Sequence, residues 1–202
     1  MAVDRELRAQ RLQAVRQRLL DGANGLLEQG AWPEVTIEQI AASAGVSRTV
    51  FYQHFADRQE LLLTLFGGIA ADLTHVADDW MVMGGADPSA EHGRSLRQLV
   101  GVFQRHGRLL QAVRDAAVSD PEVAAAWERL STGIVEETTV AIERDVAQGH
   151  TRVDDPAEMS RALTAMMENH LLRSFGRAPF PDPDAVAATL TTVWVRTLYD
   201  GR

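Results

Sequence analysis

The sequence predicts an all-α protein of nine helices in two domains, and three observations support this fold class. Apolar residues recur at helical spacing along the chain, whereas no segment alternates apolar and polar residues as a surface strand would. Helix starts are marked repeatedly by capping residues or by Asp-Pro pairs. Prolines are few, and none precedes Pro33. We expect residues 1–62 to form a small domain and residues 63–202 a larger helical one.

Capping residues and a glycine place the N-terminal helices. Thr36 and Gln39 have the spacing of a capping box, in which each side chain satisfies a free backbone amide of the other residue. Asp57 and Glu60 repeat this pattern. Gly45 can adopt the left-handed conformation that a tight turn between helices requires. Together with the apolar periodicity, these features predict helices over residues 7–28, 36–43, 47–55 and 57–80.

A loop and three Asp-Pro pairs bound the C-terminal helices. Residues 84–89, GGADPS, are rich in turn formers and predict the clearest loop of the chain. Asp120, Asp155 and Asp182 each precede a proline, which suits an N-cap followed by the first helical position. We expect five helices here, over residues 93–105, 107–118, 120–149, 156–176 and 183–199.

Composition excludes several classes of protein. The chain of 202 residues is 46% hydrophobic and 24% charged, as expected for a globular protein with a sizeable core. It has no cysteine, so disulfides, thiolate metal sites and cysteine catalysis are excluded. No apolar run approaches the roughly 18 residues of a membrane span, and no signal peptide is apparent. We therefore expect a cytoplasmic protein with no membrane partner.

The charge balance is acidic. The net charge is -8, and all 20 basic residues are arginine. An acidic chain does not bind nucleic acid through bulk charge, so any such role must depend on local geometry.

Residues 36–55, TIEQIAASAGVSRTVFYQHF, have the pattern of a helix-turn-helix. The first helix places small and apolar residues on one face, and Gly45 allows the turn that follows. Three apolar residues of the second helix point inward: Val50, Phe51 and Phe55. Its opposite face collects Arg48, Thr49, Tyr52 and Gln53. A merely solvated surface helix is the alternative, but the preceding helix and the glycine corner disfavour it.

The exposed face of the second helix suits a DNA major groove. Arg48 can pair bidentately with guanine, Gln53 can pair with adenine, and Thr49 can contact a thymine methyl group. The side chains of Tyr52 and His54 are better suited to phosphate oxygens than to base edges. The amide ends of the helices that begin at Thr36 and Ser47 can also face phosphates.

The longer stretch TIEQIAASAGVSRTVFYQHFADRQELL resembles the N-terminal signature of TetR-type transcriptional repressors. Its IA–AGVS corner precedes an aromatic-Tyr-x-His-Phe pattern and an acid-capped helix. The resemblance implies a DNA-binding domain joined through a long fourth helix to a helical ligand domain, and dimerisation through the last two helices. At the position where family members usually have a lysine that contacts phosphate, this sequence has Arg58, and the substitution keeps the positive charge. Arg48 replaces a glycine or proline of many members, so we expect it to read bases directly.

The C-terminal body is similar at scattered positions to the ethionamide-resistance repressor branch of that family. Segments VFQRHGRLLQAVRDAAVSDPEVAAAW and VWVRTLYDGR carry this resemblance. In that branch an apolar tunnel runs through the ligand domain. The resemblance implies a lining formed by Phe103, Trp127, Ile134, Glu137, Thr138, Thr164, Met167, Glu168, Leu171 and Trp194. Several of these replace aromatics or amides of the branch, so the shape and polarity of the pocket should differ.

The lining candidates also fit ordinary core packing. A stripe of apolar residues in one helix is typical of a core: Met159, Leu163, Met166, Met167 and His170. We expect Trp127 to pack in the core rather than contact ligand, while Trp194 suits either the pocket or a dimer partner. Glu168 would be costly if buried alone, so it should meet an arginine, a water or a ligand group.

Apolar stripes in the last two helices predict a dimer interface. One stripe contains Val186, Leu190, Val193, Trp194, Thr197 and Leu198, and the other Leu163, Met166, His170 and Leu171. Pairing these stripes across a two-fold axis would form a four-helix interface. A homodimer places two recognition helices in successive major grooves, so the double-stranded DNA operator should be palindromic.

We therefore expect a ligand-responsive transcriptional repressor that binds a palindromic operator as a homodimer and is released by a hydrophobic small molecule. One alternative is a DNA-binding regulator with a filled, ligandless body that acts through a protein partner. A small helical enzyme is disfavoured, because adjacent carboxylates such as Glu136-Glu137 diverge by about 100° on a helix and the histidines lack metal-ligand spacing. No cofactor and no metal are expected.

Overall fold

The computed structural model describes residues 2–82 and 88–199, which contain eight α-helices and one 3-10 helix. The N-terminal domain is built from α1 (Ala2–Leu27), η1 (Trp32–Glu34), α2 (Ile37–Ser43) and α3 (Arg48–Phe51). The rest comprises α4 (Arg58–Val82), α5 (Pro88–Ala116), α6 (Pro121–Ala147), α7 (Pro156–Phe175) and α8 (Pro183–Tyr199). The all-α fold with an N-terminal helix-turn-helix and a C-terminal helical domain is thereby confirmed.

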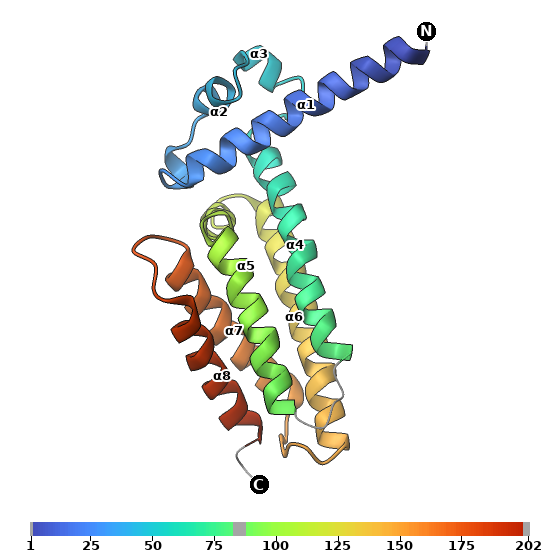
Figure 1. The fold of residues 1–202 in the computed structure, drawn as a ribbon, viewed down its shortest axis with the longest axis vertical. Helices are drawn as coiled ribbons and strands as arrows, with labels where there is room; N and C mark the ends of the chain where they lie inside the picture. The colour runs from blue at the N-terminus through green and yellow to red at the C-terminus, as the bar shows by residue number, and fades with distance from the viewer. Residues whose placement is uncertain (1, 83–87, 200–202) are drawn as a thin grey trace.

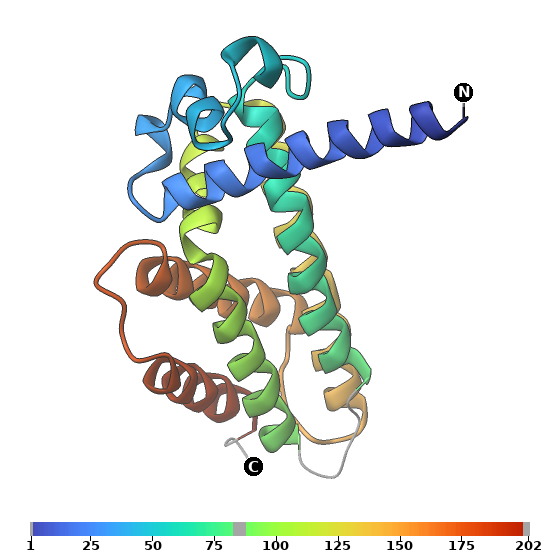
Figure 2. The ribbon, with the colours of Figure 1, turned by 45° about the horizontal axis from the view of Figure 1, so that its top comes forward.

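The helices of the C-terminal body pack around α5. Helix α4 runs from the N-terminal domain along the body, beside α5 and α6 (Figure 1). Helices α7 and α8 pack against α5 from the other side. The first turns of α1 project away from the remainder of the molecule (Figure 2).

Capping residues begin the helices where the sequence predicts. The Thr36 side chain accepts a hydrogen bond from the Gln39 amide, and the Gln39 side chain accepts one from the Thr36 amide. Asp120 and Asp155 are N-caps with proline at the first helical turn. Gly45 has a φ of 65°, so the left-handed turn between α2 and α3 is confirmed.

Two predicted helix starts differ in detail. Helix α1 begins at Ala2 and not at Leu7. Its first turns project away from the rest of the molecule, so apolar periodicity does not mark them. At the start of α4 the Glu60 amide donates to the Asp57 carboxylate, 2.8 Å away. The Glu60 carboxylate, however, accepts from the Ala56 amide at 2.6 Å, one residue earlier than a capping box requires.

The prediction of separate helices over 93–105 and 107–118 is wrong, because α5 runs unbroken from Pro88 to Ala116. Gly107, the first residue of the predicted second helix, lies inside α5, and its role is packing. A Cβ atom there would lie 2.5 Å from the carbonyl oxygen of Phe175, at the end of α7. Residues 84–87 of the predicted loop lie outside the described residues, while Pro88 and Ser89 begin α5.

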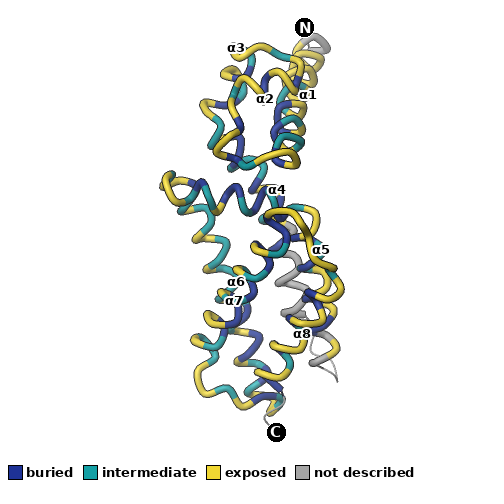
Figure 3. The backbone as a smooth tube through the Cα atoms, turned by 90° about the vertical axis from the view of Figure 1, so that its left-hand side faces the viewer, coloured by how far each residue is buried: buried dark blue, intermediate teal, exposed yellow. Residues whose placement is uncertain are grey.

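The core is one continuous cluster that extends through both domains. Figure 3 shows buried positions on the inner faces of the helices and exposed ones outside. On α4, Leu61 and Leu62 are fully buried near the N-terminal domain, and Phe66 and Leu73 are buried farther along the body. Helix α4 therefore contributes to both parts of the core. None of the described helices has an apolar stretch long enough to cross a membrane.

The apolar stripe of α8 faces inward, contrary to the prediction that it forms a dimer interface. Four of its residues are at most 6% exposed: Val186, Leu190, Trp194 and Leu198. Leu163 and Leu171 of α7 are also buried. Only the flank of the α8 stripe reaches solvent, at Val193 and Thr197. The reason is that α8 must cover α5 within its own chain, which uses the most apolar face.

Candidate nucleic-acid interface and ligand cavity

The helix-turn-helix is held by a small apolar core. Ile40 of α2 and Phe51 of α3 are fully buried, and Phe55 is 1% exposed. Gly22 allows α1 to approach α2 closely, because a Cβ atom there would lie 2.2 Å from Ser43 Oγ. Val50 is half-buried, so Phe51 of α3 and Phe55 just beyond it supply most of the inward-facing side chains.

Helix α3 is shorter than the predicted helix over 47–55. It is α-helical from Arg48 to Phe51, and the chain continues as turns. The amides of Gln53 and His54 donate to carbonyls three residues earlier, at 3.1 and 2.9 Å, so the last turn is tighter than an α-helix. Four predicted base or phosphate contacts are exposed on this unit: Arg48, Thr49, Tyr52 and Gln53. His54 is half-buried beside them.

Arg48 bridges the two helices of this motif. Its Nη1 atom lies 2.6 Å from Glu38 Oε1 of α2, and its Nη2 atom donates to the Tyr52 hydroxyl at 3.1 Å. The hydrogen bond to Tyr52 and then the Glu38 carboxylate raise the pKa of Arg48 above its usual value. Both members of the ion pair are 59% exposed, so solvent weakens it. Arg48 can therefore exchange these partners for DNA.

Thr36 and Ser47 are both exposed N-caps. The Ser47 hydroxyl accepts from the Val50 amide at 3.3 Å, as Thr36 does from Gln39 at 3.2 Å. Their side chains are thus used in capping. The neighbouring free amides of the helix N-termini remain the groups suited to phosphate.

Arg58 lies in a different environment from the other predicted contacts. It is half-buried, and its Nη1 atom donates to the carbonyl oxygens of Val35 at 2.7 Å and Trp32 at 3.2 Å. Its guanidinium carbon lies 5.5 Å from the centre of the Trp32 ring. Arg58 therefore ties the start of α4 to the connection between α1 and α2.

A cavity of about 820 Å³, including its open mouth, lies between the helices of the body. Nine of the ten predicted lining residues lie in its wall: Phe103, Trp127, Ile134, Thr138, Thr164, Met167, Glu168, Leu171 and Trp194. Glu137 is not among the residues of the wall. It is next to Thr138 on α6, and adjacent helical residues point about 100° apart.

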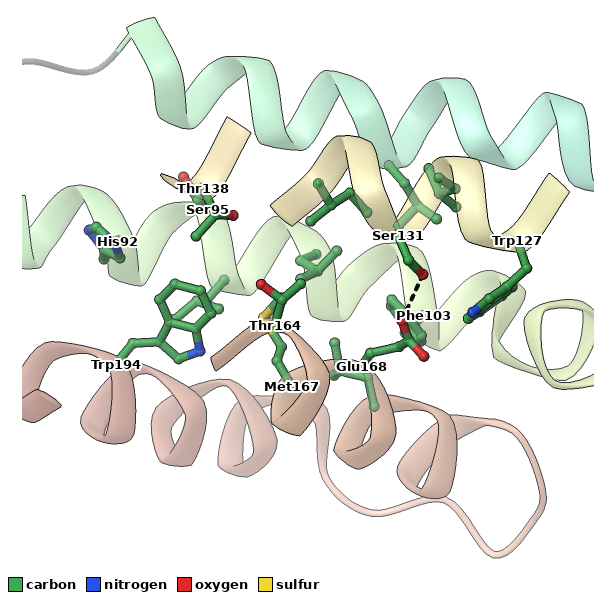
Figure 4. A pocket seen from close by; sticks show the side chains of 16 residues that line it. His92, Ser95, Phe103, Trp127, Ser131, Thr138, Thr164, Met167, Glu168 and Trp194 are labelled. Carbon is green, nitrogen blue, oxygen red and sulfur yellow. Dashed lines mark hydrogen bonds between the residues drawn. The ribbon is translucent and has the colours of Figure 1, made fainter. Parts of the chain in front are cut away.

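The cavity has apolar walls and polar groups toward both ends (Figure 4). Toward one end, Glu168 pairs with Arg114 and accepts a hydrogen bond from the Ser131 hydroxyl at 3.1 Å. This confirms that the carboxylate of Glu168 meets an arginine. The other end contains Trp194, His92, Ser95 and Thr138.

A buried hydrogen-bonded network lies behind the Trp194 end. The Tyr199 hydroxyl donates to Asp145 Oδ2 at 2.6 Å and lies 3.3 Å from His92 Nδ1. The other carboxylate oxygen of Asp145 accepts from Arg144 Nη2 at 3.2 Å. These contacts fix the His92 ring, which lines the cavity. The centres of the His92 and Trp194 rings are 6.0 Å apart.

Trp127 connects the cavity to α4. Its ring lines the cavity and stacks on the Phe66 ring, with centres 5.8 Å apart and planes at 20°. The guanidinium carbon of Arg114 lies 5.6 Å from the Trp127 ring centre. Trp127 is therefore both a cavity wall and a packing residue, whereas the sequence favoured core packing over ligand contact. Leu73 of α4 lines the cavity directly.

Two family models match the sequence. The model of bacterial regulatory proteins of the tetR family matches residues 19–65. The model of the C-terminal domain of the transcriptional regulator EthR matches residues 93–200, more than half of the chain. The chain belongs to the TetR family, with an EthR-type C-terminal domain.

Full-length relatives agree with this membership. The TetR-family chain is 26% identical over 183 residues to the transcriptional regulator EthR of Mycolicibacterium smegmatis, covering 90% of this chain and 84% of the relative. It is 26% identical over 164 residues to the transcriptional repressor AcnR of Corynebacterium efficiens, covering 78% and 80%. The protein is therefore a DNA-binding transcriptional repressor and not an enzyme.

A solved structure shares the fold. NalD, the secondary repressor of the MexAB-OprM multidrug efflux pump in Pseudomonas aeruginosa, superposes with a TM-score of 0.71 at 22% identity. The match covers 94% of this TetR-family chain and 98% of NalD.

Several lining residues were not predicted from the sequence: Leu73, His92, Ser95, Leu96, Leu99, Leu130 and Ser131. A periodic signal could have found part of this set. Ser95, Leu99 and Phe103 are spaced by four residues, so they share one face of α5, and Phe103 was already a candidate. By contrast, no local pattern indicates that α4 contributes Leu73, because that contact depends on how α4 packs.

Proposed function

We propose that this TetR-family repressor binds a palindromic operator as a homodimer and is released when a hydrophobic small molecule occupies the cavity. The observation that carries the proposal is the continuity of α4. Leu62 near its start is fully buried beside the N-terminal domain, while Phe66, one turn later, stacks on the cavity residue Trp127. A ligand that displaces Trp127 acts on the helix that positions the recognition helix.

The energetics set a condition on the ligand. It must bind the released conformation more tightly than the DNA-bound one, because equal affinity for both shifts no equilibrium. The open, mostly apolar cavity also argues against a filled body that acts only through a protein partner. We assign DNA binding to residues 1–62 and ligand binding with dimerisation to residues 63–202, with α4 crossing the boundary.

The exposed face around α3 supports a major-groove role. We propose that Arg48, Thr49 and Gln53 read base edges, and that Tyr52, His54 and the helix N-termini at Thr36 and Ser47 contact phosphates. Arg58 would contact phosphate through the guanidinium N–H groups that the carbonyls of Trp32 and Val35 leave free. If so, Arg58→Ala should weaken binding to all sequences alike and reduce the salt dependence of binding.

The dimer is proposed to form through the outer faces of α7 and α8. These faces include several small residues that are exposed in the single chain: Ala162, Ala165, Ala188, Thr189, Thr192 and Val193. Small residues let helices approach closely, as a four-helix interface requires. The interface would thus use the face opposite to the buried stripe of α8.

A selection experiment tests operator recognition. Duplexes with random sequence are selected on the purified protein, and the bound sequences are determined together with the mass of the complex. We expect two-fold symmetric sites, with half-site centres about 10 base pairs or a multiple apart, bound by an even number of chains. Asymmetric single half-sites bound by one chain would refute the homodimer.

Release is tested on the selected operator by fluorescence anisotropy. Decanol is added as an apolar probe, and its binding is followed separately by the change in total tryptophan fluorescence, to which the cavity residues Trp127 and Trp194 contribute. We expect operator affinity to fall as the cavity fills. Binding of decanol with no change in operator affinity would contradict derepression.

A further inference from the structure

Ser95 places a buried hydroxyl in the cavity wall. The residue is 8% exposed on α5, and its Oγ atom has no hydrogen-bond partner among the described residues. A buried hydroxyl without a partner costs free energy, so such groups in native proteins usually meet water or a ligand. Because Ser95 lines the cavity, its partner can arrive from the cavity itself.

Thr138 of α6 brings a second hydroxyl-bearing side chain to the cavity wall. It is 2% exposed, and Figure 4 shows it on the same side of the pocket as Ser95, toward Trp194 and His92. The hydroxyl of Thr164, by contrast, already donates to the Ser160 carbonyl at 2.5 Å. Ser95 and Thr138 thus bring hydroxyls from two different helices to this end of the cavity.

Charge is already balanced around the cavity. Glu168 is the charged side chain of the described lining, and it is paired with Arg114 and Ser131. Asp145 behind the Trp194 end is only 4% exposed and is bound by Tyr199 and Arg144. The ionisable side chain at this end, His92, is already in contact with the Tyr199 hydroxyl. A charged ligand group placed beside Ser95 would therefore lose its hydration without gaining a free counter-ion, which is unfavourable.

We propose that Ser95 and Thr138 bind the head group of the effector, and that the effector is an elongated apolar molecule with an uncharged, oxygen-bearing head such as a hydroxyl or an ester. This inference rests on the proposed function, because it concerns the same cavity. A serine or threonine hydroxyl both donates and accepts, so it can satisfy either kind of head group. The apolar walls, including Phe103 and Leu171, then enclose the chain of the ligand.

Four probes of equal chain length test the head-group preference: decanol, methyl decanoate, decanoate and decylamine. Binding is measured from tryptophan fluorescence and from the thermal shift of the full chain. We expect decanol and methyl decanoate to bind about tenfold or more tightly than the two ions. The double variant Ser95→Ala/Thr138→Val should bind the two neutral probes about tenfold more weakly, since both hydroxyls are lost.

Thr139→Val is the matched control. Thr139 is also on α6, but its hydroxyl donates to the Val135 carbonyl at 2.8 Å and it does not line the cavity. This variant should bind decanol as the unmodified protein does. Ser95→Ala alone gives a second readout, because removal of an unpaired buried hydroxyl should raise the unfolding temperature of the ligand-free protein.

The outcomes separate this inference from the proposed function. Equal binding of decanol and decanoate, or an unchanged decanol affinity in the double variant, would overturn the head-group assignment. If decanol still releases the operator in that case, the proposed function stands. If none of the four probes binds the unmodified protein, the head-group assignment and ligand-responsive release both fail.

Discussion

Arg108 of α5 caps the C-terminus of α1 through the carbonyl oxygen of Leu27, which lies 3.3 Å from its Nη1 atom. The same atom donates to the Glu28 carbonyl, and Nε lies 3.5 Å from the Glu28 carboxylate. The last carbonyls of a helix lack partners and carry partial negative charge, so a cation there is stabilising. Arg108 thereby joins the ligand domain to the DNA-binding domain independently of α4.

Loss of this cap should destabilise the junction between the domains. We expect Arg108→Ala to lower the free energy of unfolding by about 1–2 kcal/mol, with the contribution reduced by partial exposure of the side chain. Denaturant unfolding measures this, and amide hydrogen exchange should rise at the end of α1. Arg105→Ala, at an exposed position of the same helix, is the control and should change little.

Gly107 and Gly133 form a matched pair inside helices. Helix propensity alone favours alanine over glycine by about 1 kcal/mol at both positions. At Gly107 the new Cβ would meet the Phe175 carbonyl oxygen at 2.5 Å, so Gly107→Ala should destabilise by about 1–3 kcal/mol. A Cβ atom added at Gly133 would meet no atom of another helix within 4 Å, so Gly133→Ala should stabilise. Thermal unfolding of both variants checks the pair, and stabilisation by Gly107→Ala would disprove the close contact.

Glu38 competes with DNA for Arg48. Its carboxylate lies 2.6 Å from Arg48 Nη1, and both side chains are exposed. We expect Glu38→Gln to raise operator affinity several-fold, since the competing ion pair and one repulsive charge are removed. Arg48→Ala should instead cost about 1–3 kcal/mol and relax base preference at one position of each half-site. Binding titrations over selected sequences measure both, and unchanged sequence preference in Arg48→Ala would exclude base reading.

The stack of Phe66 on Trp127 should transmit cavity occupancy to α4. Phe66→Leu keeps an apolar side chain but removes the ring contact. We expect decanol to bind with nearly unchanged affinity. The decanol concentration needed for operator release should rise about tenfold, because the coupling free energy between the cavity and α4 is smaller. Fluorescence and anisotropy titrations measure the two quantities separately. Unchanged release would assign the coupling to another contact.

Much of the fold could be predicted because the relevant signals are local. The capping box at Thr36 and the N-caps at Asp120 and Asp155 involve atoms within four residues, and they form as the spacing indicates. The same holds for the left-handed Gly45. The cavity lining was largely predicted as well, but through the family resemblance rather than through periodicity.

Sequence by itself determined most of the helices, the capped starts at Thr36, Asp120 and Asp155, and the polar face of residues 48–53, since caps, turns and amphipathic periods depend on near neighbours. Tertiary packing decided the rest. Gly107 lies inside α5, where the close approach of α7 leaves no room for a side chain. Glu137 does not line the cavity, although its neighbour Thr138 does. The apolar stripe of α8 turns inward because α5 needs cover within the same chain. A sequence shows which face of a helix is apolar, but the partner of that face depends on distant residues meeting in three dimensions.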